Sequence, residues 1–410
     1  MARSFRIGSL FGIPIKLDLT FLLVLPLFAY LIGVQTLEVT EILNGVLEAG
    51  IDTADVTAGL TPWILGFVAA VGLFVGVVLH ELGHSLTARR YGFPIESITL
   101  WLFGGIAAFS EMPEDWRQEF VIAIAGPIVS VLVGVGSYGL FALTPEAFGG
   151  ARFVLGYLAV LNVALAVFNM IPAFPMDGGR VLRALLARGR PYAQATQQAA
   201  SIGKLFAIAM GLFGLFQINI ILIGVAFFVY IAASSEAQQV TMKAAFRDVT
   251  VRDIMTPAGD LHTVEPNASV AELLRRMFTE RHTGYPVVET GGAGGERLVG
   301  LVTLSDARDI KPVERDAYTV ADVMTTDLKT VDPDSDAMTA IERMREHDIG
   351  RLLVVEPRNG RGAEDSVGDP ASRTEGDLVG LISRSDVMTA FDIVQQSGAV
   401  DPSGRPRTVD

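Results

Sequence analysis

Long apolar segments alternate with short polar ones over the first part of the chain, and this pattern stops shortly after Ala233. A helix needs about 20 apolar residues to cross the hydrocarbon core of a bilayer. Beyond about Gln238 the chain is rich in charged residues and resembles a water-soluble protein. The segments long enough to span a membrane are 16–35, 62–84, 118–142, 154–174, 201–216 and 218–235. The pattern predicts a polytopic α-helical membrane domain of about six spans, followed by a soluble part.

Positive residues are unevenly distributed between the loops of this predicted bundle. Cytoplasmic loops of membrane proteins carry an excess of Lys and Arg. The segment 36–61 has no Lys or Arg, and 143–153 has only Arg152. The opposite side of the bundle carries Arg3, Arg6, Arg89, Arg90, Arg117, Arg180, Arg183, Arg188 and Arg190. This asymmetry predicts a multi-pass cell-membrane protein with both termini and the soluble part in the cytoplasm.

Two short segments interrupt the helical pattern. Gln217-Ile218-Asn219 is the only polar break between the last two spans, so a tight hairpin is expected there. Residues 97–109 are rich in strand-forming residues and contain a Gly pair. They are too short to span a bilayer, and exposed strand edges are not stable in lipid, so a strand or hairpin packed against the helices is predicted. The alternative is an interfacial hairpin without a catalytic role.

The soluble part contains an internal repeat. Residues 251–256 are echoed by 320–325, and residues 298–306 are echoed by 378–386. Each copy places an amphipathic helix and then an apolar strand between these anchors. The predicted domains are a membrane domain 1–238, a linker 239–248, a first repeat 249–310, a second repeat 318–395 with an insert 357–377 of disordered composition, and a disordered tail 396–410.

Composition restricts the partners and the metal chemistry. The chain has 410 residues and a formal net charge of −13, and most of the acidic excess lies in the soluble part. Such a surface excludes nucleic acid as a favoured partner. There is no cysteine, so disulfides and thiolate metal sites are excluded. Any zinc must therefore be held by histidine and carboxylate side chains.

A His-Glu-x-x-His pattern lies inside the second predicted span. His80 and His84 are four residues apart, so on a helix both imidazoles share one face and can present nitrogen atoms to one zinc ion. Glu81 lies beside them, where its carboxylate can accept a proton from a water molecule. Ionisable residues are costly in a bilayer and usually functional. The alternative is a polar cluster that packs helices together.

A catalytic zinc site takes three protein ligands, so a third ligand is needed. His262, His282 and His347 all lie in the soluble repeats, which leaves a carboxylate near the end of another span. Asp177 follows the fourth span, in a segment that contains two prolines and a Gly pair. The alternative for Asp177 is an Asp-Gly turn that ends a helix. Together with the upstream histidines, the ligand interpretation is favoured.

Two motifs together give the chain a family resemblance. His80-Glu81-Leu82-Gly83-His84, followed by Asn169-x-x-Pro-x-x-Pro-x-Asp177-Gly-Gly, resembles the site-2 protease family of intramembrane zinc metalloproteases. The resemblance implies that His80, His84 and Asp177 ligate one zinc ion per chain and that Glu81 is the general base. It also implies that Asn169 holds the substrate main chain or the developing oxyanion.

The same resemblance concerns two further parts of the membrane domain. Residues 97–109 match the family's membrane-inserted sheet, which is thought to pair with unwound substrate, and strand addition is a general way to capture extended backbone. Many relatives have a histidine near the position of Asp18, and this chain lacks it. Asn162 lies seven residues before Asn169, and a hydrogen bond between packed helices is expected for it.

The soluble repeats resemble a pair of cystathionine-β-synthase (CBS) domains. The resemblance implies an adenine-nucleotide sensor that takes ATP or AMP in a cleft, where the aspartate after the last strand of each copy meets the ribose. Those positions are Asp306 and Asp386, with Thr303 and Ser383 nearby. The alternative is a CBS pair that forms a homodimer and binds no nucleotide.

The resulting hypothesis is a zinc-dependent endopeptidase embedded in the lipid bilayer. It would hydrolyse a peptide bond in or near a transmembrane helix of membrane-protein substrates, under the control of nucleotide at the CBS pair. Two other functions are open at this point. One is a CBS-regulated transporter, which would need polar residues along several spans. The other is a metal-binding scaffold without proteolytic activity.

Overall fold

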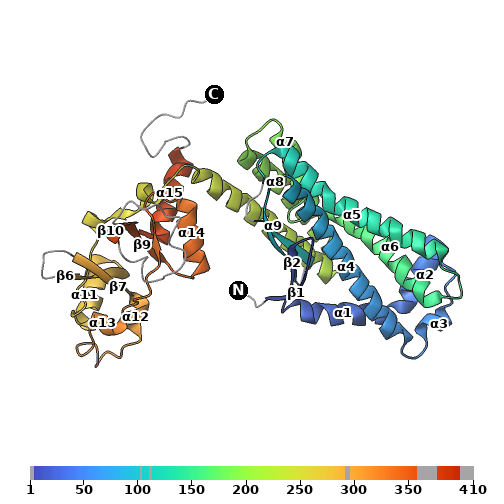
Figure 1. The fold of residues 1–410 in the computed structure, drawn as a ribbon, viewed down its shortest axis with the longest axis horizontal. Helices are drawn as coiled ribbons and strands as arrows, with labels where there is room; N and C mark the ends of the chain where they lie inside the picture. The colour runs from blue at the N-terminus through green and yellow to red at the C-terminus, as the bar shows by residue number, and fades with distance from the viewer. Residues whose placement is uncertain (1–3, 102–103, 110–112, 291–295, 358–375, 398–410) are drawn as a thin grey trace. The chain divides into compact units, whose positions relative to one another are not determined.

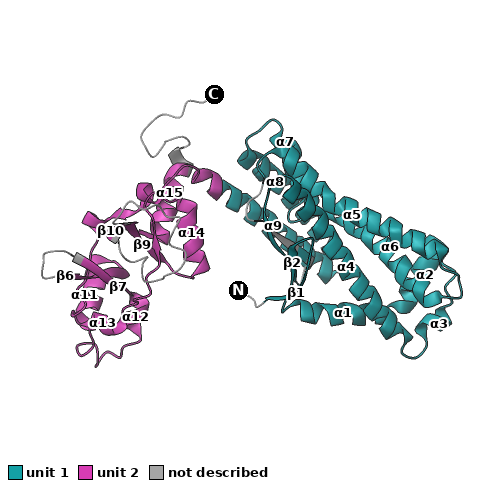
Figure 2. Cartoon of the chain, in the orientation of Figure 1, with its two compact units in different colours: residues 1–241 teal, residues 242–410 magenta. Residues whose placement is uncertain are grey.

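The structure is a computed structural model that describes residues 4–101, 104–109, 113–290, 296–357 and 376–397. Contacts within the chain divide it into two compact units, residues 1–241 and residues 242–410 (Figure 2).

The first unit is mainly helical. Its helices are α1 (Phe21–Val34), α2 (Thr36–Leu47), α3 (Thr53–Thr57), α4 (Thr61–Arg90), α5 (Trp116–Leu143), α6 (Gly149–Asn169), α7 (Asp177–Ala187), α8 (Tyr192–Phe216) and α9 (Ile220–Ala245), of which the last residues enter the second unit. Among the described residues, five of these helices are long and apolar enough to cross a membrane, and a sixth crossing results if α1 and α2 form one bent span.

Helices α4, α5 and α6 lie side by side and form the centre of the first unit (Figure 1). Leu65, Phe141 and Phe153, one from each helix, belong to one buried apolar cluster. Many other apolar side chains of the helices are exposed, as expected for surfaces that face lipid. The structure therefore agrees with the predicted polytopic membrane domain.

The first predicted span differs from the expectation of one straight helix over 16–35. Residues up to Asp18 belong to a strand, and α1 has 14 residues, which corresponds to about 21 Å. The Asp18 carboxylate accepts hydrogen bonds from the backbone N–H and hydroxyl of Thr20, and this local turn starts the helix. Helix α2 then follows at an angle of 69°. The prediction failed because the apolar residues of β2 lead into those of α1 with only Asp18 and Thr20 as polar residues at the boundary.

A four-stranded sheet accompanies the helices of the first unit. Its strands are β1 (Ser4–Leu10), β2 (Ile13–Asp18), β3 (Ile95–Trp101) and β4 (Gly104–Phe109), in the order β1-β2-β3-β4. Strands β3 and β4 form an antiparallel hairpin, as predicted for 97–109, and both lie against α4. Ile98 of β3 packs with Leu82 of α4 in a buried cluster. The sheet is thus fixed to the helix that carries the His-Glu-x-x-His motif.

The fourth predicted span, 154–174, is shorter than expected at its C-terminal end. Helix α6 ends at Asn169, and a turn leads to α7, which the apolar pattern did not indicate. Pro172 and Pro175 lack the backbone N–H that a continuing helix requires.

The hairpin expected at 217–219 is confirmed, because α8 ends at Phe216 and α9 begins at Ile220.

The second unit contains the repeats. Its elements are α10 (Val251–Ile254), β5 (Thr256–Pro257), the short 3-10 helix η1 (Ala258–Asp260), α11 (Val270–Glu280), β6 (Gly284–Thr290), β7 (Glu296–Thr303), α12 (Leu304–Arg308), α13 (Val320–Val323), β8 (Thr330–Val331), α14 (Ala337–Glu346), β9 (Arg351–Pro357), β10 (Gly376–Ser383) and α15 (Arg384–Ser397). The order of one sheet is β5-β10-β9-β8, and β6 pairs with β7.

A residue near the start of each repeat pairs with the last strand of the other repeat. Thr256 of the first copy pairs with Leu381 of the second, and Thr325 of the second copy pairs with Leu301 of the first. Each copy therefore completes the sheet of the other, which explains why the echoed motifs occur at the start and the end of each repeat.

Two predicted segments, the insert and the tail, meet the limits of the described residues. Most of the insert 357–377 and of the tail 396–410 lies outside them, while α15 continues as far as Ser397. The expected linker 239–248 is helical as far as Ala245, because its Gln, Met, Lys and Ala residues favour a helix.

Candidate metal centre

His80 and His84 lie on one face of α4, a single helical turn apart. Each residue is only 3% exposed. Their Nε2 atoms are 3.2 Å from each other, so both imidazoles direct the same ring nitrogen to one point. The i, i+4 spacing of the sequence thus brings two nitrogen ligands together inside the helix bundle.

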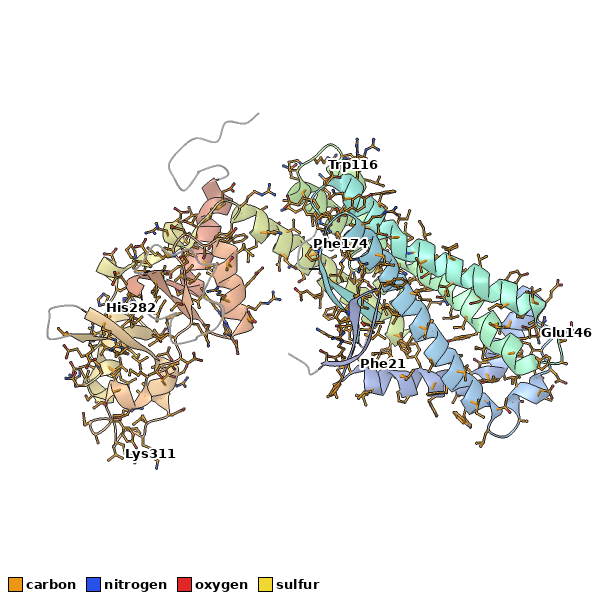
Figure 3. The ribbon with its side chains drawn as sticks, in the orientation of Figure 1. Phe21, Trp116, Glu146, Phe174, His282 and Lys311 are labelled. Carbon is orange, nitrogen blue, oxygen red and sulfur yellow. The ribbon has the colours of Figure 1, made fainter. Side chains whose placement is uncertain are left out.

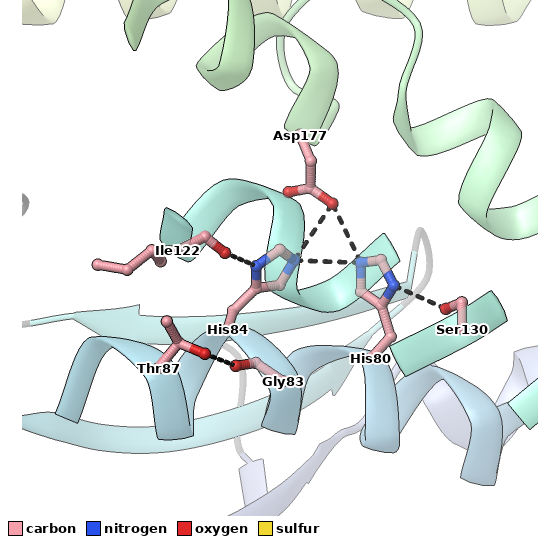
Figure 4. Close-up of polar contacts among 7 residues, drawn as sticks. All are labelled: His80, Gly83, His84, Thr87, Ile122, Ser130 and Asp177. Atoms are coloured by element: carbon pink, nitrogen blue, oxygen red, sulfur yellow. Dashed lines mark hydrogen bonds and ion pairs between the residues drawn. The ribbon is translucent and has the colours of Figure 1, made fainter. Parts of the chain in front are cut away.

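Asp177 reaches this point from a different part of the chain. It is the first residue of α7, and its Oδ2 atom lies 3.1 Å from His80 Nε2 and 3.2 Å from His84 Nε2. Figure 4 shows the carboxylate pointing between the two rings. Among the described residues, these three side chains are the one group of three or more His, Asp or Glu residues whose ligand atoms lie within 4.8 Å of one another.

Hydrogen bonds on the far side of each ring fix the two imidazoles. His84 Nδ1 lies 2.7 Å from the carbonyl oxygen of Ile122, which can only accept, so Nδ1 carries the proton and Nε2 keeps its lone pair. His80 Nδ1 lies 2.8 Å from the hydroxyl oxygen of Ser130. Both partners belong to α5 (Figure 4). Metal-ligating histidines are usually oriented by such outer contacts.

The donor set fits zinc. Two imidazole nitrogens and one carboxylate oxygen are ligands that zinc prefers, and three protein ligands leave a position for a reactant. Ligands about 2.0–2.1 Å from a tetrahedral zinc are about 3.3 Å apart. The separations of 3.1 and 3.2 Å between the ligand atoms agree with that distance.

Glu81 is half-buried and lies against the β3–β4 hairpin. A Cβ atom added to Gly105 of β4 would lie 2.4 Å from the Cγ atom of Glu81. The carbon chain of Glu81 therefore passes directly over the Gly105 backbone. Glu81 directly follows His80 in α4, and its side chain lies beside the sheet.

Asn169 is the last residue of α6 and is half-buried. Within the described residues, its side-chain amide has no hydrogen-bond partner, so the amide is available to a ligand. Asn162 is fully buried, but the hydrogen bond expected between packed helices is not the one that forms: its Nδ2 atom donates to the carbonyl oxygen of Leu158, within its own helix. Its side chain also packs against Gly76 of α4, so it fills a helix-helix contact.

The sequence did not identify three residues that contact the site. Ile122 contributes only its backbone carbonyl group, which any residue type would supply. Gly105 contributes the absence of a side chain. Ser130 offers a weak signal, since it is a hydroxyl residue inside a long apolar segment, but its partner could not be inferred without the packing of α5 against α4.

The four residues expected at the nucleotide site occupy equivalent places in the two repeats. The Asp306 carboxylate accepts hydrogen bonds from the backbone N–H of Thr303 at 2.7 Å and from its hydroxyl at 2.8 Å. The Asp386 carboxylate accepts from the same groups of Ser383 at 2.8 Å and 2.6 Å. These bonds stabilise the first turns of α12 and α15, so each aspartate has a local structural role.

Comparison with known proteins finds a matching family model for each of the two units. A model of Peptidase family M50 matches residues 68–146 and 144–212, and a model of the CBS domain matches residues 251–311 and 320–362. A zinc metalloprotease of Methanocaldococcus jannaschii is 35% identical over 398 residues, which cover 96% of this chain and 98% of that protein.

Solved structures match each unit separately. A site-2 protease from Methanocaldococcus jannaschii is 40% identical, with a TM-score of 0.41, over 57% of this chain and 95% of that one. The structure of CBSX2 in complex with AMP is 26% identical, with a TM-score of 0.27, over 36% of this chain and 98% of that one.

The apolar helices and the family matches define a multi-pass membrane metalloprotease with a pair of CBS domains. The chain belongs to Peptidase family M50, and it is a zinc metalloprotease. The family resemblance and the enzyme class expected from the two motifs are thus confirmed. Membership in a peptidase family also favours hydrolysis over the transporter alternative.

Proposed function

We propose that the protein hydrolyses a peptide bond in or near a transmembrane helix of membrane-protein substrates, at a site formed by His80, His84, Asp177 and Glu81. The observation that carries this proposal is the convergence of His80 Nε2, His84 Nε2 and Asp177 Oδ2 at separations of 3.1–3.2 Å. When bound there, zinc supplies Lewis-acid activation of water and stabilises negative charge.

The side chains of this chain would perform the proton transfers. Glu81 accepts a proton from the attacking water and delivers it to the nitrogen of the leaving amine. Ser130 and the carbonyl of Ile122 keep the imidazoles in the orientation and tautomer that ligation requires. The amide N–H groups of Asn169 donate to the substrate carbonyl as its oxygen gains charge.

The hairpin beside Glu81 would hold the substrate. A helical peptide bond is shielded by its own hydrogen bonds, so a protease must first extend the segment that it cuts. Strand β4 is at the edge of the sheet and lies against α4. An extended substrate segment that pairs with β4 would pass close to Glu81, because Glu81 lies directly over Gly105.

Metal analysis tests the ligand set. The His80→Ala variant should lose most of the zinc that the purified wild-type protein retains, while Asn162→Ala, a buried change in the neighbouring helix, should keep it. Undiminished zinc in His80→Ala would contradict the assignment of His80 as a ligand.

The CBS pair is proposed to bind ATP or AMP and to regulate cleavage. Thr303, Asp306, Ser383 and Asp386 are the residues assigned to ribose recognition. The match of residues 251–311 and 320–362 to the CBS domain supports this. Each aspartate also uses only Oδ2 in its helix cap, and no partner of Oδ1 is present among the described residues, so Oδ1 can accept a bond from a ligand.

Titration of ATP and AMP into the full-length protein tests the nucleotide site. Asp386→Asn should weaken binding about tenfold or more, since a charged hydrogen-bond acceptor is lost. Asp322→Asn is the matched control, because Asp322 caps α13 in the same way at a position without an assigned nucleotide role. Equal binding in Asp386→Asn and wild type would contradict the site. The mass of the protein in the same experiment reports whether the CBS pair forms a homodimer.

The orientation is proposed to be cytoplasmic for both termini. Arg89 and Arg90 end α4, and Arg117 begins α5 on the same side. On the opposite side Arg152 is only 8% exposed and donates to the carbonyl oxygen of Ala49, so its guanidinium is not displayed at the loop surface. The chain has no cysteine, so one introduced at Asp115 can be labelled selectively. Labelling from the external side of intact cells would contradict this orientation.

A further inference from the structure

Arg183 is a buried charge to which the proposed mechanism assigns no role. It lies in α7, six residues after Asp177, and its side chain is 1% exposed. Burying a guanidinium in a membrane domain is costly, and such residues are usually retained for a specific purpose.

Two carboxylates from different helices bind the Arg183 guanidinium. Its Nε and Nη2 atoms lie 2.7 Å and 2.6 Å from Glu119 Oε1, on α5. Its Nη1 atom lies 2.6 Å from Glu236 Oε1, on α9. The Glu119 side chain is 4% exposed and that of Glu236 is 29% exposed. Arg183 thus joins α7 to α5 and α9 through charged hydrogen bonds, which are among the strongest.

Two aromatic rings enclose the same guanidinium. Its central carbon lies 5.0 Å from the ring centroid of Phe174, which Figure 3 labels, and 4.8 Å from that of Tyr192 at the start of α8. Phe174 is 2% exposed and precedes Asp177 by three residues. The contact therefore reaches the turn from which the Asp177 carboxylate enters the metal centre.

Two of the contacts of Arg183, those with Glu119 and Phe174, lie close in the chain to residues of the metal centre. Glu119 lies one helical turn before Ile122, whose carbonyl accepts the hydrogen bond from His84. Phe174 lies in the turn that leads to Asp177. The pair formed by Arg183 and Glu119 consequently holds the helix that carries Asp177 against the turn of α5 that orients His84.

We propose that Arg183 is a positioning residue for the metal centre, which fixes Asp177 relative to His84. It does so through its contacts with Glu119, Glu236 and Phe174. This inference rests on the proposed zinc site. Glu236 adds a connection to α9, so a displacement of α9 would act on the position of Asp177 through Arg183. The planar guanidinium is suited to this role, because it can bind two carboxylates at once, whereas an ammonium group is a single point charge.

The rate of zinc release to a chelator tests the proposal in the purified full-length protein. Arg183→Lys keeps the charge but cannot span both carboxylates. We expect zinc release to be about tenfold faster or more, the lower end of the effect of losing a direct contact to a metal ligand, because Asp177 is then held less firmly. The visible spectrum of the cobalt-substituted protein should also change. Release and spectrum at the wild-type values would overturn the proposal.

Arg152→Lys is the matched control. Arg152 is also a buried arginine of the membrane domain, but it binds backbone carbonyl oxygens away from the metal centre. Zinc release from Arg152→Lys should equal that of wild type, and an equal acceleration in both variants would overturn a specific role for Arg183. If Arg183→Lys does not fold, Glu236→Gln removes only the partly exposed partner, and a wild-type release rate in that variant overturns the proposal. Zinc retained in His80→Ala is a separate result, which would remove the proposed zinc site itself.

Discussion

Asp177 Oδ2 lies 3.1 Å from Nε2 of His80, although 97 positions separate the two residues in the chain. The contact joins the first residue of α7 to the middle of α4. Neither helix determines this distance alone, since it depends on how the turn before α7 folds and on how α5 packs against both helices.

Ser130→Ala should weaken zinc binding. The hydroxyl group of Ser130 is the described hydrogen-bond partner of His80 Nδ1, and loss of such an outer contact typically costs 10- to 100-fold in metal affinity, by order of magnitude. Competition with a zinc chelator measures the effect. Ser137→Ala is the matched control, because Ser137 is also a buried serine of α5 but does not contact either histidine. An unchanged affinity in Ser130→Ala would show that this hydrogen bond does not orient His80.

Gly105→Ala should reduce cleavage while zinc stays bound. The added Cβ would lie 2.4 Å from Glu81 Cγ, and the flexible Glu81 side chain can move away at little cost to the fold. A displacement of about 1 Å at a catalytic group can cost about 100-fold in rate. The turnover of a model transmembrane substrate and the zinc content should be measured together. Gly136→Ala, which meets nothing within 4 Å, should behave as wild type. Loss of zinc in Gly105→Ala would indicate a different defect.

Gly178→Ala should destabilise the protein and release zinc. A Cβ atom at this position would lie 2.3 Å from the carbonyl oxygens of both Met170 and Ile171, which are backbone atoms and cannot rotate away. Forcing extra volume into such a contact costs about 1–3 kcal/mol or more. A lower thermal unfolding temperature in detergent and a lower zinc content are expected. Gly189→Ala has nothing within 4 Å and should change neither, and the same result for Gly178→Ala would refute the packing of this turn.

The first CBS repeat should lose local stability in acid through Glu280. Desolvation acts to raise the pKa of this carboxylate, but hydrogen bonds from Arg276 and Tyr285 outweigh it, so the pKa lies below its ordinary value of 4.5. His262 also contacts the carboxylate, at 2.8 Å. A depressed pKa stabilises the fold above the ordinary value, and this contribution disappears as the pH falls below it.

Amide hydrogen exchange of α11 and β6 in the full-length protein measures this effect. Protection in wild type should exceed that in Glu280→Gln at pH 7, and the difference should shrink as the pH falls below 4.5. Glu272→Gln changes an exposed glutamate of the same helix and serves as the control. A difference between wild type and Glu280→Gln that does not depend on pH would contradict the prediction.

The sequence alone was sufficient for the fold classes of both units. Helical spans of about 20 apolar residues are long signals, and a repeated motif of several residues identifies a duplicated domain. The strand that ends at Asp18 was missed, because its apolar residues lead almost directly into the apolar helix α1. Helix α7 was missed because its 11 residues are too short and too polar to register among membrane spans.

At the metal centre, the sequence could indicate residue types but not their surroundings. His80 and His84 follow from helical periodicity, since the i, i+4 spacing is local. The contribution of the Ile122 carbonyl could not be predicted, because a backbone group has no signature in the sequence. The Arg183 network could not be predicted either, since its partners lie 64 and 53 positions away and depend on packing.

Cleavage by Glu81→Gln is the most direct test of the proposed mechanism. The variant keeps the size of the side chain but removes the basic carboxylate, and Glu81 is not among the proposed ligands. Purified wild type and Glu81→Gln should be compared in lipid vesicles with a model transmembrane substrate, with the zinc content of each measured. We predict full zinc content and no detectable cleavage by Glu81→Gln. Cleavage at the wild-type rate would contradict the assignment of Glu81 as the general base.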